Sequence, residues 1–378
     1  MLFKTRLTTI VVLLLSMQTF AQQDSLQGKA QSNNPLKNGL DKEVEKLVRP
    51  YIQKSNTAGL ILAVIHKGKV YRYSYGTVDK KRKELPKPST LFEIGSITKT
   101  FTSLLLAEQV LEGKMSLDDP INRYLPDSVK DISANGMPVR LVHLANHTSG
   151  FPRLPANIFQ MKVDRNDPYR NYVHDSLYSY LVRYQATTPP GQVYAYSNFG
   201  AGLLGVILER QLGAGFQTLV EERICKPLKM FHTFIDIPTG QAAAFAQGYN
   251  ELGLPASPWD LGSLKGAGAL RSTLDDMVLY LKAQLGAGND LAKAIVLTHE
   301  PTFTGPGQQM ALGWLIGRHG ENVYYQHSGG TGGYRSFAGF SPEQQFAVVI
   351  LSNAAEDVTP IGQALSAFAE EATHVAER

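Results

Sequence analysis

A serine and a lysine, Ser96 and Lys99, lie three residues apart in the stretch LFEIGSITKT, where an apolar helical run begins. Residues i and i+3 share one face of a helix, so the two side chains can meet if a helix starts near Ser96. Unpaired backbone N–H groups and the helix dipole favour developing negative charge at that point. A lysine whose pKa is lowered by burial could take the serine proton, although an N-cap serine beside a solvated lysine fits the spacing equally well.

A second candidate group lies in TPPGQVYAYSNFG, where Tyr196 and Asn198 follow a Pro-Gly turn and precede an expected helix. A phenol beside an ammonium group can lose its proton more readily and act as a general base. The amide of Asn198 can orient both the substrate and the lysine. A similar triplet, Tyr169 to Asn171, lies in the polar run DRNDPYRNYVHDS without the turn-to-helix context, so we discount it.

The third candidate is the glycine-rich stretch QHSGGTGGYRSF. His327, Ser328 and Gly329 end an expected strand, and Gly330 follows. Glycines at this place let a substrate backbone approach an exposed strand edge. A plain hairpin turn is an open alternative. A phosphate-binding loop is a further alternative, but the stretch lacks a Walker lysine and the strand-loop-helix order.

Strand patterns occur near both ends of the chain. Residues 37–54 have helical apolar spacing, with a kink expected at Pro50, and GLILAVIHKGKVYRYSYGTVD then reads as a β-hairpin with a Lys-Gly turn. The strand pattern returns only in ENVYYQHSGG, GYRSFAGFS and QFAVVILSN, which precede another helix. We therefore expect one sheet assembled from both chain ends.

The middle of the chain is richer in helical signals. SITKTFTSLLLAEQVLEG, FGAGLLGVILERQLG and LDDMVLYLKAQLG are the expected helices, and no internal repeat is found. This order predicts an α+β catalytic domain over residues 37–378. Its sheet subdomain comprises residues 37–90 and 300–378, and an all-helical subdomain, residues 91–299, is inserted between them.

The first 21 residues are typical of a secretory signal peptide. Lys4 and Arg6 precede an apolar stretch, and a cut is expected after Ala21. The apolar stretch is short for a membrane span, and a buried N-terminal helix is the alternative interpretation. Residues 22–36 are polar and without periodicity, which predicts a disordered tether. We expect a periplasmic or secreted protein.

The net charge and the cysteine content exclude some classes of function and of covalent stabilisation. The net charge of +4 falls to +2 without residues 1–21, because they contain two basic residues and no acid. The basic run at residues 80–83 lacks stacking aromatic residues, so we interpret it as a solvated turn and expect no nucleic-acid partner. Cys225 is the only cysteine, so an intrachain disulfide is excluded.

Together, SITK, YSN and HSG resemble the active-site signature of class C β-lactamases and the related D-alanyl-D-alanine peptidases and esterases. LVRPYIQ, LVHLANHTSGFP, ICKPLKM and GAGALRSTLDDM also resemble recurring stretches of that family. The resemblance implies an antiparallel sheet flanked by helices, a helical domain, and a site in the cleft between them. It implies a serine hydrolase that forms an acyl-enzyme with β-lactam or D-alanyl amide substrates.

The resemblance also implies roles for individual residues. Ser96 would be the acylated nucleophile, Lys99 its activator, and Tyr196 a proton relay that also serves deacylation. Asn198 would contact the substrate amide, while the backbone N–H groups of Ser96 and Gly330 would form the oxyanion hole. His327, Ser328 and Gly329 would complete the substrate-binding strand. We expect no metal or other cofactor, a small-molecule or peptidoglycan-derived substrate, no stable membrane span, and a monomer.

His327 departs from the family pattern, which usually has lysine there in a KTG triplet. Histidine with an ordinary pKa of about 6.5 is mostly neutral at physiological pH, so we expect weaker carboxylate recognition. Relatives with histidine at this place include esterases and D-amino-acid peptidases, which are the alternative function. We also expect activity to change near neutral pH as His327 titrates.

Three rival interpretations have less support in the sequence. His143 and His147, four residues apart in LVHLANHTSG, could bind a metal from one helical face, but no glutamate of an HExxH motif accompanies them. An α/β-hydrolase is not indicated, because no Gly-x-Ser-x-Gly stretch occurs. A penicillin-binding or sensing module without turnover is the non-enzyme alternative. Pocket shape is expected to depend on the segment of residues 152–175.

Overall fold

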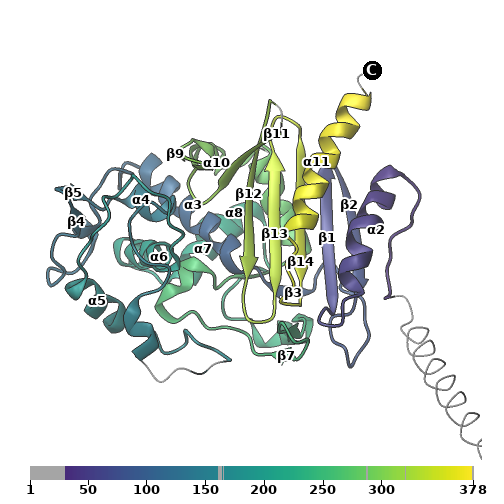
Figure 1. Cartoon of the computed structure of the whole chain (residues 1–378), viewed down its shortest axis with the longest axis horizontal. Helices are drawn as coiled ribbons and strands as arrows, with labels where there is room; N and C mark the ends of the chain where they lie inside the picture. The colour runs from purple at the N-terminus through teal and green to yellow at the C-terminus, as the bar shows by residue number, and fades with distance from the viewer. Residues whose placement is uncertain (1–29, 161–163, 165, 287, 320, 377–378) are drawn as a thin grey trace, which may run out of the picture.

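A computed structural model describes residues 30–160, 164, 166–286, 288–319 and 321–376 (Figure 1). The expected signal peptide, residues 1–21, lies outside the described residues. None of the helices in the described ranges has the length and apolar character needed to cross a membrane.

One large antiparallel sheet forms the centre of the molecule, in the strand order β2-β1-β14-β13-β12-β11-β10-β9. Two strands come from the N-terminal part and six from the C-terminal part, so the sheet expected from both chain ends is confirmed. The strands are β1 (Gly59–His66), β2 (Lys69–Gly76), β9 (Phe303–Gly305), β10 (Gln308–Met310), β11 (Leu315–His319), β12 (Asn322–Gly330), β13 (Arg335–Ser341) and β14 (Phe346–Ser352).

The sheet is buried on both faces, as β1 shows. Alternate residues of a strand point to opposite faces, and β1 is apolar at nearly every position. Leu60, Leu62 and Val64 pack in one core with Val44 of α2 (Gly39–Ile52) and residues of α11 (Thr359–Ala376). Ile61, Ala63 and Ile65 belong to the larger core on the other face. In Figure 1, α2 and α11 lie together in front of the sheet.

The turn between β1 and β2 follows directly from its two residues. Lys67 and Gly68 have φ angles of 48° and 81°, so both are in the left-handed region. This is the conformation of the two-residue hairpin turn whose twist matches that of the flanking strands. The register then pairs His66 with Lys69 and Gly59 with Gly76. The expected Lys-Gly hairpin is confirmed.

The expected disordered tether is wrong over residues 30–36. The N–H of Gly76 donates to the carbonyl of Gln31 at 2.9 Å, and the N–H of Asn33 donates to the carbonyl of Ser74 at 3.2 Å. These residues lie along the free edge of β2, whose backbone groups would otherwise have no strand partner. Such pairing uses the backbone and needs no apolar periodicity. Residues 22–29 lie outside the described residues.

Helices and short strands make up the middle of the chain. Helix α3 is buried around its whole circumference over residues 98–107, and α9 packs against β1 and β14. The proposed subdomain boundary at residues 91–299 stays a prediction. The helices are α3 (Thr98–Leu111), α4 (Leu141–Ala145), α5 (His174–Arg183), α6 (Asn198–Leu212), α7 (Phe216–Val220), α8 (Lys226–Leu228), α9 (Leu274–Gln284) and α10 (Ala292–His299). Three two-stranded sheets pair β3 (Leu91–Glu93) with β8 (Arg271–Thr273), β4 (Ser133–Ala134) with β5 (Met137–Pro138), and β6 (Gly248–Tyr249) with β7 (Pro255–Ala256).

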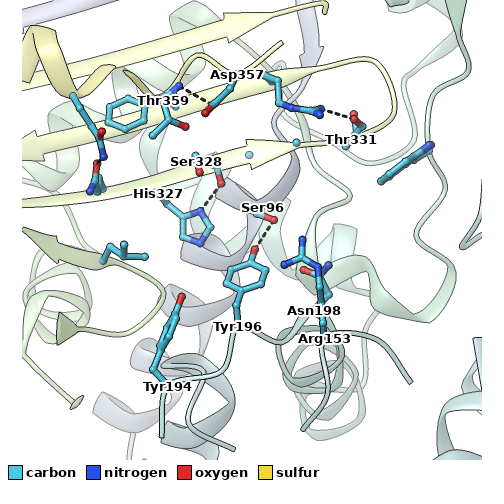
Figure 2. A pocket seen from close by; sticks show the side chains of 18 of the residues that line it. Ser96, Arg153, Tyr194, Tyr196, Asn198, His327, Ser328, Thr331, Asp357 and Thr359 are labelled. Atoms are coloured by element: carbon cyan, nitrogen blue, oxygen red, sulfur yellow. Dashed lines mark hydrogen bonds between the residues drawn. The ribbon is translucent and has the colours of Figure 1, made fainter. Parts of the chain in front are cut away.

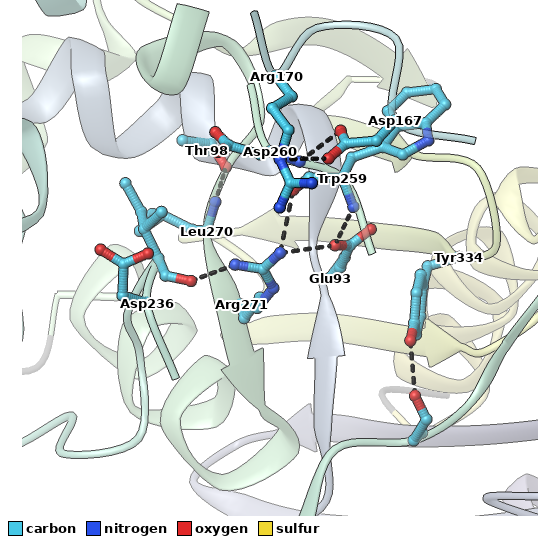
Figure 3. A network of polar contacts seen from close by, with 12 residues as sticks. Glu93, Thr98, Asp167, Arg170, Asp236, Trp259, Asp260, Leu270, Arg271 and Tyr334 are labelled. Atoms are coloured by element: carbon cyan, nitrogen blue, oxygen red, sulfur yellow. Dashed lines mark hydrogen bonds and ion pairs between the residues drawn. The ribbon is translucent and has the colours of Figure 1, made fainter. Parts of the chain in front are cut away.

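A buried ion pair joins β3 to β8, immediately before the Ser96 turn (Figure 3). Nη2 of Arg271 lies 3.1 Å from Oε1 of Glu93 and donates to the carbonyl of Trp259 at 3.0 Å. The N–H of Trp259 donates to the same Glu93 oxygen at 2.9 Å, and Nη1 of Arg271 donates to the carbonyl of Ile235. Burial raises the pKa of Glu93, and the Arg271 charge opposes that rise. The pair therefore holds the Trp259 segment against the strand that leads to Ser96.

Replacing Arg271 by methionine would leave Glu93 buried without its partner. We expect the free energy of unfolding to fall by about 3–5 kcal/mol. The control is Arg72→Met, which removes an exposed partner of Asp275 and should cost less than about 1 kcal/mol. Urea denaturation followed by circular dichroism measures both variants. Equal, small losses would show that the Glu93 pair does not stabilise this fold.

Candidate active site

Ser96 and Lys99 meet where a short 3₁₀ turn, η1 (Gly95–Ile97), runs into α3. Nζ of Lys99 lies 2.9 Å from Oγ of Ser96, 2.9 Å from Oδ1 of Asn198 and 2.6 Å from the carbonyl oxygen of Ala267. The Lys99 side chain belongs to the first turn of the buried helix α3, and the residue is only 2% exposed. The expected contact between Ser96 and Lys99 is present, and the solvated-lysine alternative is wrong because the amine is enclosed.

Tyr196 and Asn198 reach the same point from the start of α6. Ser197 is the N-cap of this helix and accepts a hydrogen bond from the N–H of Gly200 at 2.9 Å. The Tyr196 hydroxyl, just before the cap, donates to Oγ of Ser96 at 2.7 Å. The turn-to-helix context therefore brings Tyr196 and Asn198 to Ser96, as expected. Tyr169 also lines the cavity, where its ring packs edge-on against that of Trp259.

Burial decides the charge states of Lys99 and Tyr196. Desolvation, followed by the positive charge of Arg153, lowers the pKa of Lys99 well below its ordinary value. Desolvation raises the pKa of Tyr196 to about 12, and its hydrogen bond with Ser96 opposes this only in part. The expected acidified phenol is therefore wrong. Loss of water around the Tyr196 hydroxyl outweighs the positive charge of Arg153.

Nζ of Lys99 lies within hydrogen-bond distance of three oxygens, and its lowered pKa favours the neutral amine over the ammonium form. The oxygens of Asn198 and Ala267 are carbonyl oxygens, which only accept hydrogen bonds. A neutral amine has two N–H groups for these two carbonyls, and its lone pair is then directed to the Ser96 hydroxyl. This arrangement can remove the serine proton, while the protonated Tyr196 donates to the same oxygen.

Strand β12 approaches the Ser96 turn so closely that two glycines are required. A Cβ atom on Gly95 would lie 2.6 Å from the backbone nitrogen of Gly330, and one on Gly329 would lie 2.1 Å from the carbonyl oxygen of Ile94. Real Cβ atoms do not tolerate such contacts with backbone atoms. The structure thus brings the backbone of Gly330 next to the turn that carries Ser96, which is the placement expected for the oxyanion hole.

His327 lies on β12 beside Tyr196, with 6.3 Å between the ring centres, and is 4% exposed. Its Nδ1 lies 2.7 Å from the carbonyl oxygen of Ser328. A carbonyl only accepts, so Nδ1 carries the hydrogen and Nε2 holds a lone pair, for which the described residues provide no partner. Burial is the largest cause that lowers the pKa of His327 below its ordinary value. The expected titration near neutral pH is therefore wrong.

One cavity of about 610 Å³ is lined by Ser96, Tyr196, Asn198, His327 and Gly330 (Figure 2). The segment of residues 152–175 contributes to its wall, as expected. No motif marks the other lining residues, some of which lie in loops and the rest on β11, β12, β13 and α11. These are Arg153, Tyr194, Trp259, Leu315, Gln326, Thr331, Arg335, Phe337, Asp357, Thr359 and Gln363.

The geometry of His143 and His147 does not suit a shared metal ion. His147 follows the end of α4 with a φ angle of 61°, so the two rings do not share a helical face. Nδ1 of His147 accepts a hydrogen bond from the N–H of Ser197 at 3.2 Å, and its ring packs 4.4 Å from that of Tyr196. His147 supports the Tyr196 segment. Within the described ranges, no group of three His, Cys, Asp or Glu side chains could hold a metal ion.

A family model for β-lactamases matches residues 44–367. The chain belongs to the β-lactamase family. It is a serine hydrolase, related to a β-lactamase of Pseudomonas fluorescens with 29% identity over 346 residues, covering 82% of this chain and 92% of that protein. A β-lactamase of Escherichia coli (strain K12) is 27% identical over 346 residues, covering 82% of this chain and 88% of that protein.

Solved structures of the family share the fold. A β-lactamase/D-alanine carboxypeptidase from Pseudomonas syringae superposes with a TM-score of 0.76 and 26% identity, covering 86% of this chain and 97% of that chain. A class C β-lactamase gives a TM-score of 0.76 with 25% identity, covering 87% of this chain and 96% of that chain. The family and the α+β fold expected from the sequence are both confirmed.

Replacing Arg153 by glutamine removes a positive charge near Lys99, so we expect the pKa of Lys99 to rise. Only the neutral amine can accept the Ser96 proton, so labelling of Ser96 by a fluorophosphonate should lose rate at a higher pH than in the wild type. Arg153→Lys keeps the charge and is the control. Labelling rates over a pH series provide the measurement. If the labelling rate of Arg153→Gln falls at the same low pH as that of the wild type, Arg153 does not set the charge of Lys99.

Proposed function

We propose that this chain is an exported hydrolase that cleaves β-lactam or D-alanyl amide substrates, and related esters, through an acyl-enzyme on Ser96. The observation that carries the proposal is the pair of contacts that Ser96 Oγ makes, with Lys99 Nζ at 2.9 Å and with the Tyr196 hydroxyl at 2.7 Å. An activated nucleophile needs a base and a second proton-carrying group within this reach.

Acylation begins when Oγ of Ser96 attacks the substrate carbonyl and its proton passes to the neutral amine of Lys99. The backbone N–H groups of Ser96 and Gly330 stabilise the oxyanion, and Asn198 holds the substrate amide. The bond to the leaving group then breaks, and the leaving nitrogen or oxygen takes the proton of the Tyr196 hydroxyl. The proton held on Lys99 then passes to the Tyr196 oxygen, which restores the Tyr196 hydroxyl and the neutral Lys99 amine.

Deacylation uses the same groups with water in place of Ser96. Water attacks the acyl carbon, and its proton passes through the Tyr196 hydroxyl to the Lys99 amine. Lys99 returns this proton to Oγ of Ser96 as the acyl bond breaks, so the enzyme regains its starting state. Both Tyr196 and Lys99 are present, which favours turnover over the alternative of a penicillin-binding or sensing module. A burst of product without steady-state hydrolysis would favour the sensing module.

His327 bears on the choice of substrate. The neutral ring presents the lone pair of Nε2 and offers no charge to a carboxylate, unlike the lysine usual in the family. We therefore propose that esters and uncharged amides compete well with substrates that carry a free carboxylate beside β12. An esterase or D-amino-acid peptidase is the second candidate function. The Pseudomonas syringae structure, described as both a β-lactamase and a D-alanine carboxypeptidase, supports amide chemistry of either kind in this fold.

The N-terminal pattern supports a periplasmic or secreted location, with a mature chain that starts near Gln22. The monomer expected from the sequence stays a prediction.

Ser96→Ala should abolish turnover and leave the fold intact, because only the nucleophilic oxygen is removed. A fluorophosphonate or β-lactam probe should form one covalent adduct on Ser96 of the wild-type protein, and none in the variant. Intact-mass and peptide mass spectrometry of protein from a bacterial periplasm would locate the adduct and give the N-terminus. Ser116→Ala, at an exposed serine, is the control. Labelling at another serine would overturn the assignment, and a retained Met1 would overturn the proposed export.

His327→Lys should improve the use of a D-alanyl-D-alanine peptide relative to the same peptide with a C-terminal amide. A charge-assisted hydrogen bond to the carboxylate predicts a change of about tenfold or more in the ratio of kcat/KM values. His327→Gln adds no charge and is the matched control. If the lysine variant leaves the ratio unchanged, His327 does not set this specificity.

A further inference from the structure

Three charged side chains are among the described residues that line the cavity, namely Arg153, Arg335 and Asp357. His327 also lines the cavity but is neutral, so it adds no charge to these three. The lining thus carries two positive charges and one negative charge, which favours a substrate with an anionic group.

Arg335 is already engaged with the protein. Its Nη1 donates to the carbonyl of Thr331 at 2.7 Å and to that of Tyr334 at 2.9 Å. These two bonds hold the guanidinium against the turn that follows β12, where Arg335 borders the cavity.

Among the described residues, the Arg153 guanidinium has no comparable hydrogen-bond partner. Its guanidinium carbon lies 5.0 Å from the centre of the Tyr196 ring, and no carboxylate of the described residues forms a salt bridge with it. Its backbone is nevertheless fixed, because the carbonyl of Arg153 accepts hydrogen bonds from the N–H groups of Asn198 at 3.0 Å and Phe199 at 3.2 Å. The start of α6 therefore holds in place an arginine whose planar donors face the cavity. Such donors match a carboxylate in two-point geometry.

Figure 2 shows the Tyr196 ring between His327 on one side and Arg153 with Asn198 on the other. We propose that Arg153 binds a carboxylate on the part of the substrate that lies beside Asn198. Under the proposed function, on which this inference rests, that part is the acyl group that becomes attached to Ser96. The anion-binding group would thus lie across the cavity from β12, where the family usually has its lysine.

A matched pair of substrates tests this inference. The 4-nitrophenyl esters of 4-carboxybenzoic acid and 4-carbamoylbenzoic acid have acyl groups of the same shape, and only the first is an anion. The Lys99 and Tyr196 steps are common to both, so any effect of Arg153 on them cancels in the ratio of kcat/KM values. Arg153→Gln should lower the ratio of acid to amide by about 10- to 100-fold, the range for a charge-assisted hydrogen bond. Arg153→Lys should retain part of the wild-type preference for the acid.

Two further variants serve as controls. Arg72→Gln, at an exposed ion pair on β2, should leave the ratio as in the wild type. Arg335→Gln should lower the ratio less than Arg153→Gln does, and an equal or larger loss would assign the anion to Arg335 and overturn the proposal. If Arg153→Gln hydrolyses both esters with the wild-type ratio of kcat/KM values, Arg153 only packs on Tyr196. That result would also overturn the proposal. If neither ester is cleaved and Ser96 is not labelled, the proposed function itself fails.

Discussion

The enclosure of one amine, that of Lys99, is the constraint on which the site depends. A lysine in contact with water is protonated and cannot accept the Ser96 proton, so the amine must be kept dry, yet its N–H groups still need acceptors. Three distant parts of the chain satisfy this requirement. The buried helix α3 carries Lys99, the start of α6 supplies Asn198, and the turn before β8 supplies the carbonyl of Ala267. The helical middle of the chain thus serves to desolvate one functional group.

The sheet contributes the other half of the site by close approach. Strand β12 can bring the backbone of Gly330 to the Ser96 turn only because Gly95 and Gly329 have no side chain to separate them. The Glu93–Arg271 pair holds the strand that leads into this turn. Catalysis would therefore rely on the close contact between β12 and the Ser96 turn.

The sequence predicted the groups whose spacing is local, and could not predict those defined by tertiary environment. Ser96 and Lys99 share a helical turn, and Tyr196 and Asn198 flank a helix cap, so their contacts follow from short-range rules. The long strand runs likewise predicted the sheet. The protonation states of His327 and Tyr196 depend on which atoms surround them after folding. Expectations based on ordinary pKa values were therefore wrong for both residues. Arg153 lies in an irregular segment where no periodicity marks its direction.

The pairing of β1 with β14 has a consequence for the timing of folding. The hydroxyl of Ser352 donates to the carbonyl of Gly59, 293 positions away along the chain, and β12 and β13 add to the sheet through β14. Contacts of such separation close slowly, because the entropy of a long loop must be lost before they form. During synthesis, a ribosome-bound chain that already contains Ser96 and Lys99 still lacks Gly330. The hydrolase therefore stays inactive until its last strands have been made and paired with its first.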